Sequence, residues 1–166
     1  MSKFSNPKKS DFIKSIPEKS IDDDNDDLAK RCKFNFSYFI VPEGKTGFEV
    51  WPQQNLVILI DKLRDYCRES LIYWTQQKVG RNKKGCILTF YGGFPRKSAF
   101  KIPLHVPHEA VWGRFRLDWS GRLCGFVVPE KYAGKTHKSG FTFDANTLYV
   151  VFIDDNHQFY QGGESK

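Results

Sequence analysis

The sequence lacks acidic residues over a continuous stretch in its middle. Residues 70–108 contain no Asp and no Glu, although charged residues make up 27% of the 166-residue chain. Basic and acidic residues balance elsewhere, seven against seven in 1–31, five against five in 32–69 and seven against seven in 109–166. The net charge of +7 therefore arises in this window, which attracts polyanions. Its basic residues are Lys78, Arg81, Lys83, Lys84, Arg96, Lys97 and Lys101.

Long apolar runs are also lacking. No run of eighteen apolar residues occurs, so we expect no membrane span. The opening "MSKFSNPKKSDFIKS" has no apolar core of the kind that a secretory signal needs, and we therefore expect a soluble, cytoplasmic protein. Apolar residues nevertheless make up 40% of the chain and aromatics 16%, which is enough for one hydrophobic core without covalent staples.

Motifs for metals and disulfides are missing too. The four cysteines form no C-x-x-C and no Cys/His pair at zinc-finger spacing, so we expect reduced thiols in the core. "GRNKKG" lacks the Gly-Lys-Ser/Thr ending of a phosphate-binding P-loop, and "DDDNDD" lacks the Gly and Glu of a calcium loop. We expect no cofactor and no metal; the alternative is Mg²⁺ held by Asp144, Asp154 and Asp155.

Residues 1–31 have the composition of a flexible leader. They are polar, mix acidic with basic residues, and cluster acids between Asp22 and Asp27, so they bury too little surface to offset the entropy of ordering. An alternative is that this acidic cluster folds back on the basic window and competes with its ligand. Residues 32–166 are predicted to form a single domain.

Hydrophobic periodicity predicts an α+β fold. Apolar residues at helical spacing predict one long amphipathic helix that begins at Pro52 and ends before Gly80. Alternation and turn residues predict strands at 34–41, 86–91, 99–102, 111–118, 122–128, 147–154 and 157–160. We expect the helix to pack on a twisted, mostly antiparallel sheet of about five to six strands.

The basic window has the pattern of a nucleic-acid interface. Two Gly-bounded loops, "GRNKKG" and "YGGFPRKS", allow close approach to phosphate, and aromatic rings between the cations are able to stack on bases. The alternatives are a solvated loop with core aromatics, or an acidic protein partner. The predicted nucleic-acid-binding residues are Lys78, Arg81, Lys83, Lys84, Arg96, Lys97, Lys101, Arg114, Tyr91 and Phe94.

The stretch "WGRFRLDWSGRL" reads as a hairpin with arginines on one face. Period-two alternation places Arg114 and Arg116 opposite Phe115, and Arg122 begins the facing strand. Three guanidiniums in this arrangement predict a fork for phosphate oxygens. The alternative is ordinary ion pairing of these arginines with Asp118 or Glu130.

The stretch "DDNHQFY" contributes candidate groups for proton transfer. Cleavage of RNA without a metal needs a base for the 2′-hydroxyl, an acid for the leaving oxygen and cations for the phosphorane. The predicted catalytic residues are His157, Tyr160, Arg116 and Arg122. The alternative is that His157 is only a surface side chain at a turn.

The order "WGRFRLD…GRLCGFVV…FDANTLYVVFIDDNHQFY" resembles small bacterial proteins found with mobile elements and defence loci. It also resembles, more loosely, the last three strands of RelE/ParE-like toxins. Those toxins are small basic α/β proteins, and some cleave ribosome-bound mRNA with Arg, Lys, His or Tyr on that sheet. The resemblance implies the same roles for the four residues named above.

Together these patterns predict a nucleic-acid-binding or nucleoprotein-binding accessory module of a bacterial mobile-element or defence system. RNA is the favoured ligand over DNA. The alternatives are a metal-independent endoribonuclease of RelE-like type, or a protein-interaction module. That module would be a homodimer or an accessory subunit of an RNA-guided nuclease complex, with Trp51, Trp112 and Trp119 as exposed anchors.

Overall fold

The computed structural model describes residues 7–17, 20–22, 27–45, 47–80, 85–117 and 121–161. Several residues with predicted roles lie outside the described residues. They are Asp23, Asp24 and Asp26 of the acidic cluster, Arg81, Lys83 and Lys84 of the basic window, and Asp118 and Trp119 of the predicted hairpin.

The described residues form an α+β fold with a mostly antiparallel sheet, as the sequence predicts. The elements in chain order are α1 (Pro7–Ser15), β1 (Lys33–Asn35), η1 (Phe48–Val50), α2 (Gln53–Tyr66), α3 (Leu71–Gln76), β2 (Lys78–Val79), β3 (Gly85–Cys86), β4 (Leu88–Gly92), β5 (Val111–Arg116), β6 (Arg122–Val127), η2 (Glu130–Tyr132) and β7 (Thr147–Asp154). Five strands make one sheet in the order β1-β7-β6-β5-β4, and β2 pairs with β3 in a small second sheet. Only the β1–β7 pairing is parallel among these described strands.

The prediction of one long helix from Pro52 to Gly80 is wrong. The structure has two shorter helices, α2 and α3, because the chain between them makes other bonds. The end of α2 is bonded to the residue before β1, since Cys32 Sγ donates to the carbonyl of Tyr66 at 3.2 Å. The Ser70 side chain then accepts from the N–H of Tyr73 at 3.2 Å and caps the start of α3.

The apolar stripe predicted for the helix is only partly buried. Leu59, Tyr66 and Leu71 are in the core as expected. Ile60, which the same periodicity places on that stripe, is 62% exposed. No helix among the described residues is both long enough and apolar enough to cross a membrane.

Three of the predicted strands are shortened or absent. The segment 34–41 contributes only β1, because the chain turns where the N–H of Phe39 donates to the carbonyl of Phe36 at 3.0 Å. The segments 99–102 and 157–160 are loops instead of strands. The remaining predictions agree with β3 and β4 together, β5, β6 and β7.

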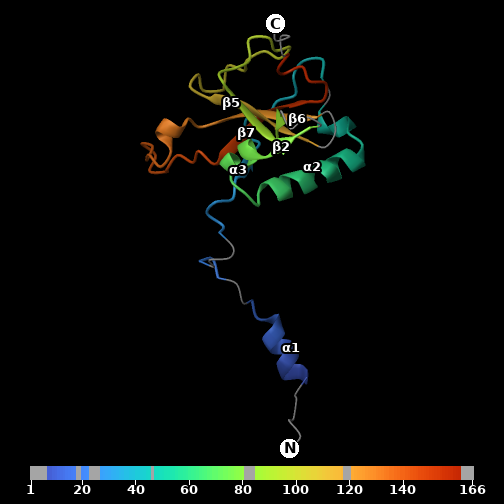
Figure 1. The fold of residues 1–166 in the computed structure, drawn as a ribbon, viewed down its shortest axis with the longest axis vertical. Coiled ribbons are helices and arrows are strands. Elements are labelled where there is room, and N and C mark those ends of the chain that lie inside the picture. The colour runs from blue at the N-terminus through green and yellow to red at the C-terminus, as the bar shows by residue number, and fades with distance from the viewer. Residues whose placement is uncertain are drawn as a thin grey trace, which may run out of the picture.

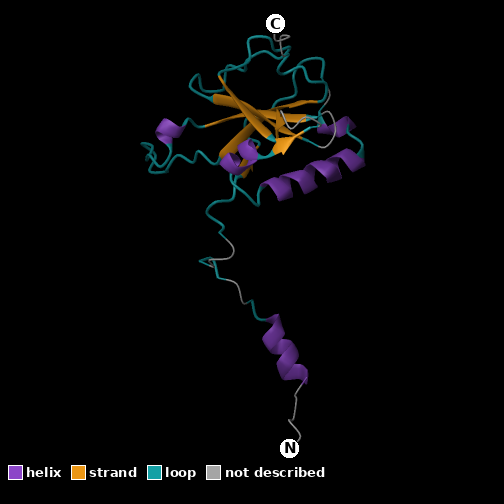
Figure 2. Ribbon diagram, in the orientation of Figure 1, coloured by secondary structure: helices purple, strands orange, loops and turns teal. Residues whose placement is uncertain are grey.

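The buried apolar residues form two clusters, one on each side of the sheet. Helices α2 and α3 lie on one side, where the buried core includes Leu59 and Phe115. Loops cover the other side, as Figure 2 shows, and the buried core there includes Trp112, Phe152 and Phe159. Because successive side chains of a strand point to opposite faces, each central strand contributes to both layers.

Helix α1 stands apart from the sheet (Figure 1), and none of its residues is buried. Polar contacts tie the chain to the domain at Lys30, whose ammonium lies 3.4 Å from a carboxylate oxygen of Glu69. Two residues later Cys32 is buried, with 1% exposed. All four cysteines are free thiols.

A glycine on β6 supplies a test of the central ladder. A Cβ on Gly125 would collide with the carbonyl oxygen of Tyr149 on β7, where the β6–β7 register shifts. We expect Gly125→Ala to lower the free energy of unfolding by about 3 kcal/mol, because rigid backbone must move. Urea denaturation measures the loss. Gly93→Ala is the matched control, since a Cβ there meets nothing within 4 Å; equal stability of the two variants would contradict the packing described.

Candidate nucleic-acid interface

Three arginines lie on the loop-covered face of the sheet. Arg114 and Arg116 alternate with the buried Phe115 along β5, which confirms the predicted facing of that strand. Arg116 is directly opposite Arg122 on β6, and Arg122 is opposite Asp154 on β7. Cross-strand partners share a face, so Arg116, Arg122 and Asp154 are neighbours on three adjacent strands. We call the three arginines of this face, Arg114, Arg116 and Arg122, the arginine row.

The arginine row combines one buried guanidinium with two that are half-buried. Arg122 is buried, with 4% exposed, and burial together with the charges of Arg116 and Arg114 lowers its pKa. Its Nη1 donates to the carbonyl of Gly121 at 2.6 Å. Arg114 and Arg116 are half-buried, and neither is within ion-pair distance of a carboxylate among the described residues.

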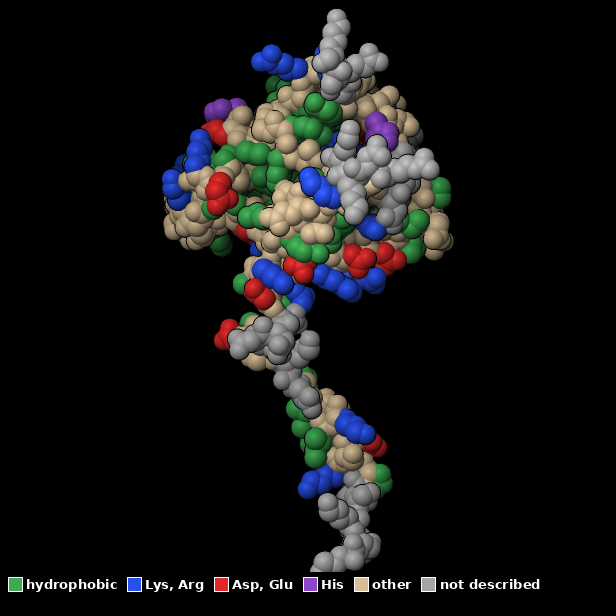
Figure 3. All heavy atoms as spheres, in the orientation of Figure 1, with side chains coloured by type: hydrophobic (Ala, Val, Ile, Leu, Met, Phe, Trp, Pro, Cys, Tyr) green, Lys and Arg blue, Asp and Glu red, His purple; other side chains and the backbone are tan. Residues whose placement is uncertain are grey.

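Such an arrangement costs stability in the free protein. Like charges directly opposite on neighbouring strands repel, and desolvating a guanidinium adds to that cost. The exposed Arg64 of α2 and Arg68 just after it differ, because Arg64 lies 3.3 Å from Asp61 and Arg68 lies 3.9 Å from Asp65. Figure 3 shows acidic and basic side chains side by side along the lower edge of the domain. Arg114 and Arg116 differ from these arginines in having no acidic partner within the described residues.

Asp154, opposite Arg122, accepts hydrogen bonds from backbone N–H groups. Its carboxylate accepts from the N–H groups of Asn156 at 3.2 Å, Gln158 at 3.0 Å and Phe159 at 2.8 Å. It is 1% exposed. These bonds hold the turn that follows β7, and within that turn His157 adopts a positive φ of 56°. Left-handed backbone is uncommon outside glycine, so Asp154 constrains where His157 lies.

The turn places His157 where the charges of the arginine row act on it. Burial lowers the pKa of His157, and the charges of Arg122, Arg114 and Arg116 lower it further, while Asp154 acts in the opposite direction. The imidazole is therefore biased toward its neutral form, which accepts a proton. The charges of Arg116 and Arg122, two of the four predicted catalytic residues, therefore act on His157, which is another of them.

A pair of tyrosines continues the face beyond Arg114. The ring of Tyr91 stacks on that of Tyr160 with centroids 4.6 Å apart, and Arg114 Cζ lies 5.7 Å from the Tyr91 centroid. The Tyr91 hydroxyl is buried and has no hydrogen-bond partner among the described residues. Burial raises the pKa of Tyr91 to about 12. Tyr160 is 44% exposed, so part of its ring faces solvent.

The described basic residues of the window lie at both ends of this face. At one end, Lys78 lies 3.5 Å from the sulfur of Cys86, and the neighbouring Gly85 is beside the guanidinium of Arg116. At the other end, the carbonyl of Lys97 accepts from the N–H of Gln161 at 3.2 Å, next to Tyr160. Arg96 and Lys101 are exposed on the same loop layer.

Two aromatic rings with predicted binding roles are used in packing instead. Phe94 packs edge-on against Trp112, with centroids 4.8 Å apart, and also against Phe159. Trp112 is 2% exposed, so its prediction as an exposed anchor is wrong. Trp51 is half-buried and packs against Phe48.

The alternative of a magnesium site is not supported by the geometry. Asp144 precedes β7 and Asp154 ends it, so these carboxylates are at opposite ends of an eight-residue strand. Asp144 is bound to Lys33 at 2.7 Å, and this ion pair and hydrogen bonds lower its pKa against the effect of burial. Among the described residues, no group of three or more His, Cys, Asp or Glu is placed to hold a metal.

Sequence reasoning missed the stacked tyrosines and the role of Asp154. Tyr91 and Tyr160 are far apart in the chain, and a register shift between Phe90 and Gly92 gives Tyr91 its place. A usable signal for Asp154 was its position directly after an apolar strand and before "DNH", because Asp side chains often accept from backbone N–H groups in turns.

Comparison with protein-family models, with curated proteins and with solved structures gave no match. The resemblance to mobile-element proteins and to RelE/ParE-like toxins therefore stays a prediction.

The proximity of His157 to the arginine row is testable by titration. Replacing Arg114 and Arg116 together with Gln removes two cations that lower the pKa of His157, so that pKa is expected to rise toward its ordinary value. Titration of the His157 ring by NMR measures the change. The double variant Arg64→Gln with Arg68→Gln loses the same charge on α2 and should leave the His157 pKa unchanged. An equal shift in both would mean that the arginine row does not act on His157.

Proposed function

We propose that this protein binds nucleic acid, with RNA as the preferred ligand, on the loop-covered face of its sheet. The arginine row would contact phosphates, and the described basic residues at either end would extend the contact along the strand. The observation that carries the proposal is the placement of three arginines on one face, with Arg116 directly opposite Arg122 and Arg114 beside them on β5.

The like charges of Arg116 and Arg122 repel each other across the β5–β6 pairing. A phosphate placed between the guanidiniums converts an unfavourable like-charge arrangement into charge-assisted hydrogen bonds. Arginine suits this role because its planar fork matches phosphate oxygens and its charge persists when it is half-buried. Release of counterions from the nucleic acid adds to the affinity and makes it depend on salt.

The tyrosine pair favours a single-stranded ligand. An unpaired base has a free face that is able to stack on the exposed part of Tyr160, while Tyr91 supports the ring from behind. A duplex keeps its bases stacked on one another and offers no such face. The biological setting that we propose, an accessory module of a mobile-element or defence system, follows from the sequence resemblance alone.

Removal of charge from the row tests this function. We expect Arg114→Gln with Arg116→Gln to weaken binding of labelled single-stranded RNA by roughly tenfold. It should also flatten the slope of log affinity against log salt by about 1.4, since two phosphate contacts are lost. Fluorescence anisotropy at several salt concentrations measures both quantities.

The matched control for binding is again Arg64→Gln with Arg68→Gln, whose arginines already have acidic partners. Its affinity should stay close to that of the unchanged protein. Equal losses in the two double variants would show that only net charge matters and would contradict a site on the sheet. Affinity that does not weaken with salt would contradict phosphate recognition altogether.

A second candidate function, metal-independent RNA cleavage, is favoured by one further observation. His157 is held in left-handed backbone next to the arginine row, with its pKa lowered. In this proposal neutral His157 takes the proton of a 2′-hydroxyl, whose oxygen attacks the adjacent phosphorus. Arg116 and Arg122 stabilise the phosphorane, and the Tyr160 hydroxyl protonates the departing 5′-oxygen. The products are a 2′,3′-cyclic phosphate and a 5′-hydroxyl.

Cleavage is measured with excess RNA and a chelator present. If the protein is an enzyme of this kind, His157→Ala should slow cleavage about a hundredfold, because a general base is lost. The matched control is His137→Ala, since His137 is also exposed and its ring contacts Ser139 and Phe143 on a different loop. Binding without cleavage, or cleavage that His157→Ala leaves unchanged, would exclude this mechanism and leave the binding function standing.

A further inference from the structure

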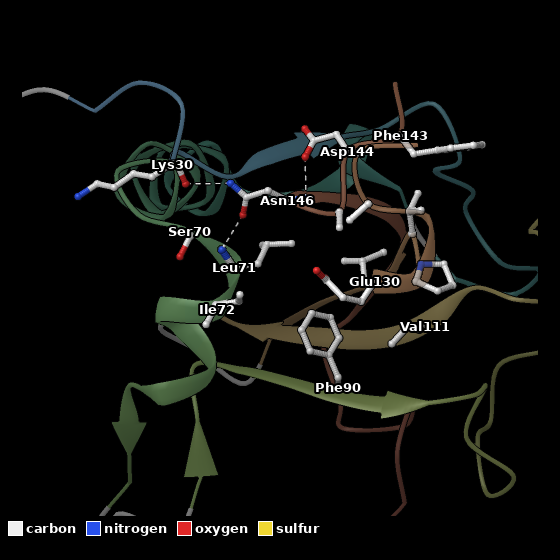
Figure 4. A pocket seen from close by; sticks show the side chains of 16 residues that line it. Lys30, Ser70, Leu71, Ile72, Phe90, Val111, Glu130, Phe143, Asp144 and Asn146 are labelled. Atoms are coloured by element: carbon white, nitrogen blue, oxygen red, sulfur yellow. Dashed lines mark hydrogen bonds between the residues drawn. The ribbon is translucent and has the colours of Figure 1, made fainter. Parts of the chain in front are cut away.

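A hollow of about 550 Å³ opens on the helix-covered side of the sheet, away from the arginine row. Figure 4 shows it between α3 and the chain that follows β6, with Leu71, Ile72 and Phe90 on its walls. Val111 and Phe143 complete much of its apolar lining. Its size and lining are those of a site for apolar groups.

The rim of the hollow is built by one asparagine. Asn146 Oδ1 accepts from the N–H of Leu71 at 2.9 Å, and its Nδ2 donates to the carbonyl of Lys30 at 2.8 Å. The Asp144 carboxylate in turn accepts from the N–H of Asn146 at 2.7 Å. The chain that leads back to α1 therefore leaves the domain at the mouth of the hollow.

Helix α1 carries a largely exposed apolar surface. Phe12 is 68% exposed, Ile13 is 50% exposed and Ile16, one residue past the helix, is 49% exposed. By helical geometry these three side chains fall within about 100° of arc. A nine-residue helix is marginal in water by itself, so α1 needs a partner surface to persist.

The two surfaces differ in charge and lie within reach of each other. α1 carries Lys8, Lys9 and Lys14 against a single acid. The hollow carries Glu130, while its Asp144 and Lys30 are already paired with Lys33 and Glu69. Residues 17–29 connect Ile16 to the rim and span roughly 45 Å when extended. A tether of this length keeps α1 at a high effective concentration near its own hollow.

We propose that α1 of the same chain docks in this hollow, with Phe12 and Ile13 as anchors against Ile72 and Phe90. Docking buries the apolar faces of both partners and turns the leader into a helical strap on α3. Because the hollow is on the other side of the sheet from the arginine row, this state leaves the candidate nucleic-acid interface open. The proposal is independent of that interface.

Limited trypsin digestion of the full chain tests docking, with cleavage after Lys14 followed by mass spectrometry. Two variants should each speed that cleavage about tenfold, because each removes one side of the contact. Phe12→Ser alters the helix, and Ile72→Asp alters the wall of the hollow. Circular dichroism and urea denaturation establish that both variants remain folded.

Matched controls are available on both sides of the contact. Ile21→Ser changes an apolar tether residue that is 83% exposed, and Ile60→Asp changes an exposed residue of α2. Both should leave cleavage after Lys14 at its original rate. Cleavage that is equally fast in all five proteins would overturn the proposal. Protection that appears only as protein concentration rises would also overturn it, because the occupant would then be α1 of a second copy.

Discussion

The register of the β5–β6–β7 ladder is the constraint on which the rest depends. It places Arg116, Arg122 and Asp154 in one row, and it places Phe115 and Leu123 in the opposite layer. A slip of one residue would move every guanidinium into the apolar layer beneath the helices. The buried residues on both faces therefore hold the arginines together against their mutual repulsion.

This ladder also explains why the loop layer is ordered around aromatic rings. Trp112, Phe152 and Phe159 fill the space on the face that carries the arginines, and they share it with the turn that Asp154 holds. The apolar part of the face anchors the loops, and the polar part is left for His157 and the arginine row. One surface thus combines a rigid support with three arginines, an arrangement that suits the anion site that we propose.

The two sides of the sheet have different openings. The loop side presents cations and stacked tyrosines, whereas the helix side presents an apolar hollow next to the point where the leader joins the domain. The gap between α2 and α3 contributes to that hollow, because Ser70 and Leu71 are part of its lining. A single uninterrupted helix, as the periodicity predicts, would leave no such rim.

Much of the sheet could be predicted because strand alternation is local. Arg114, Phe115 and Arg116 alternate within three residues, so their facing follows from the sequence alone. The break at Ser70 was not predictable in the same way, since it depends on Cys32 reaching the end of α2 from far along the chain. The prediction of Trp112 as an exposed anchor was wrong for a similar reason, because burial depends on which loops cover a face.

The fold class, the location of the excess charge and the facing of Arg114 and Arg116 could all be predicted from the amino-acid sequence. These follow from composition and period-two alternation, which require no knowledge of distant neighbours. Three features became visible only in the folded chain. Tyr160 stacks on Tyr91, the arginine row acts on the pKa of His157, and a hollow opens beside α3. Each of these depends on strand order and on loop packing, which bring together residues from separate parts of the chain.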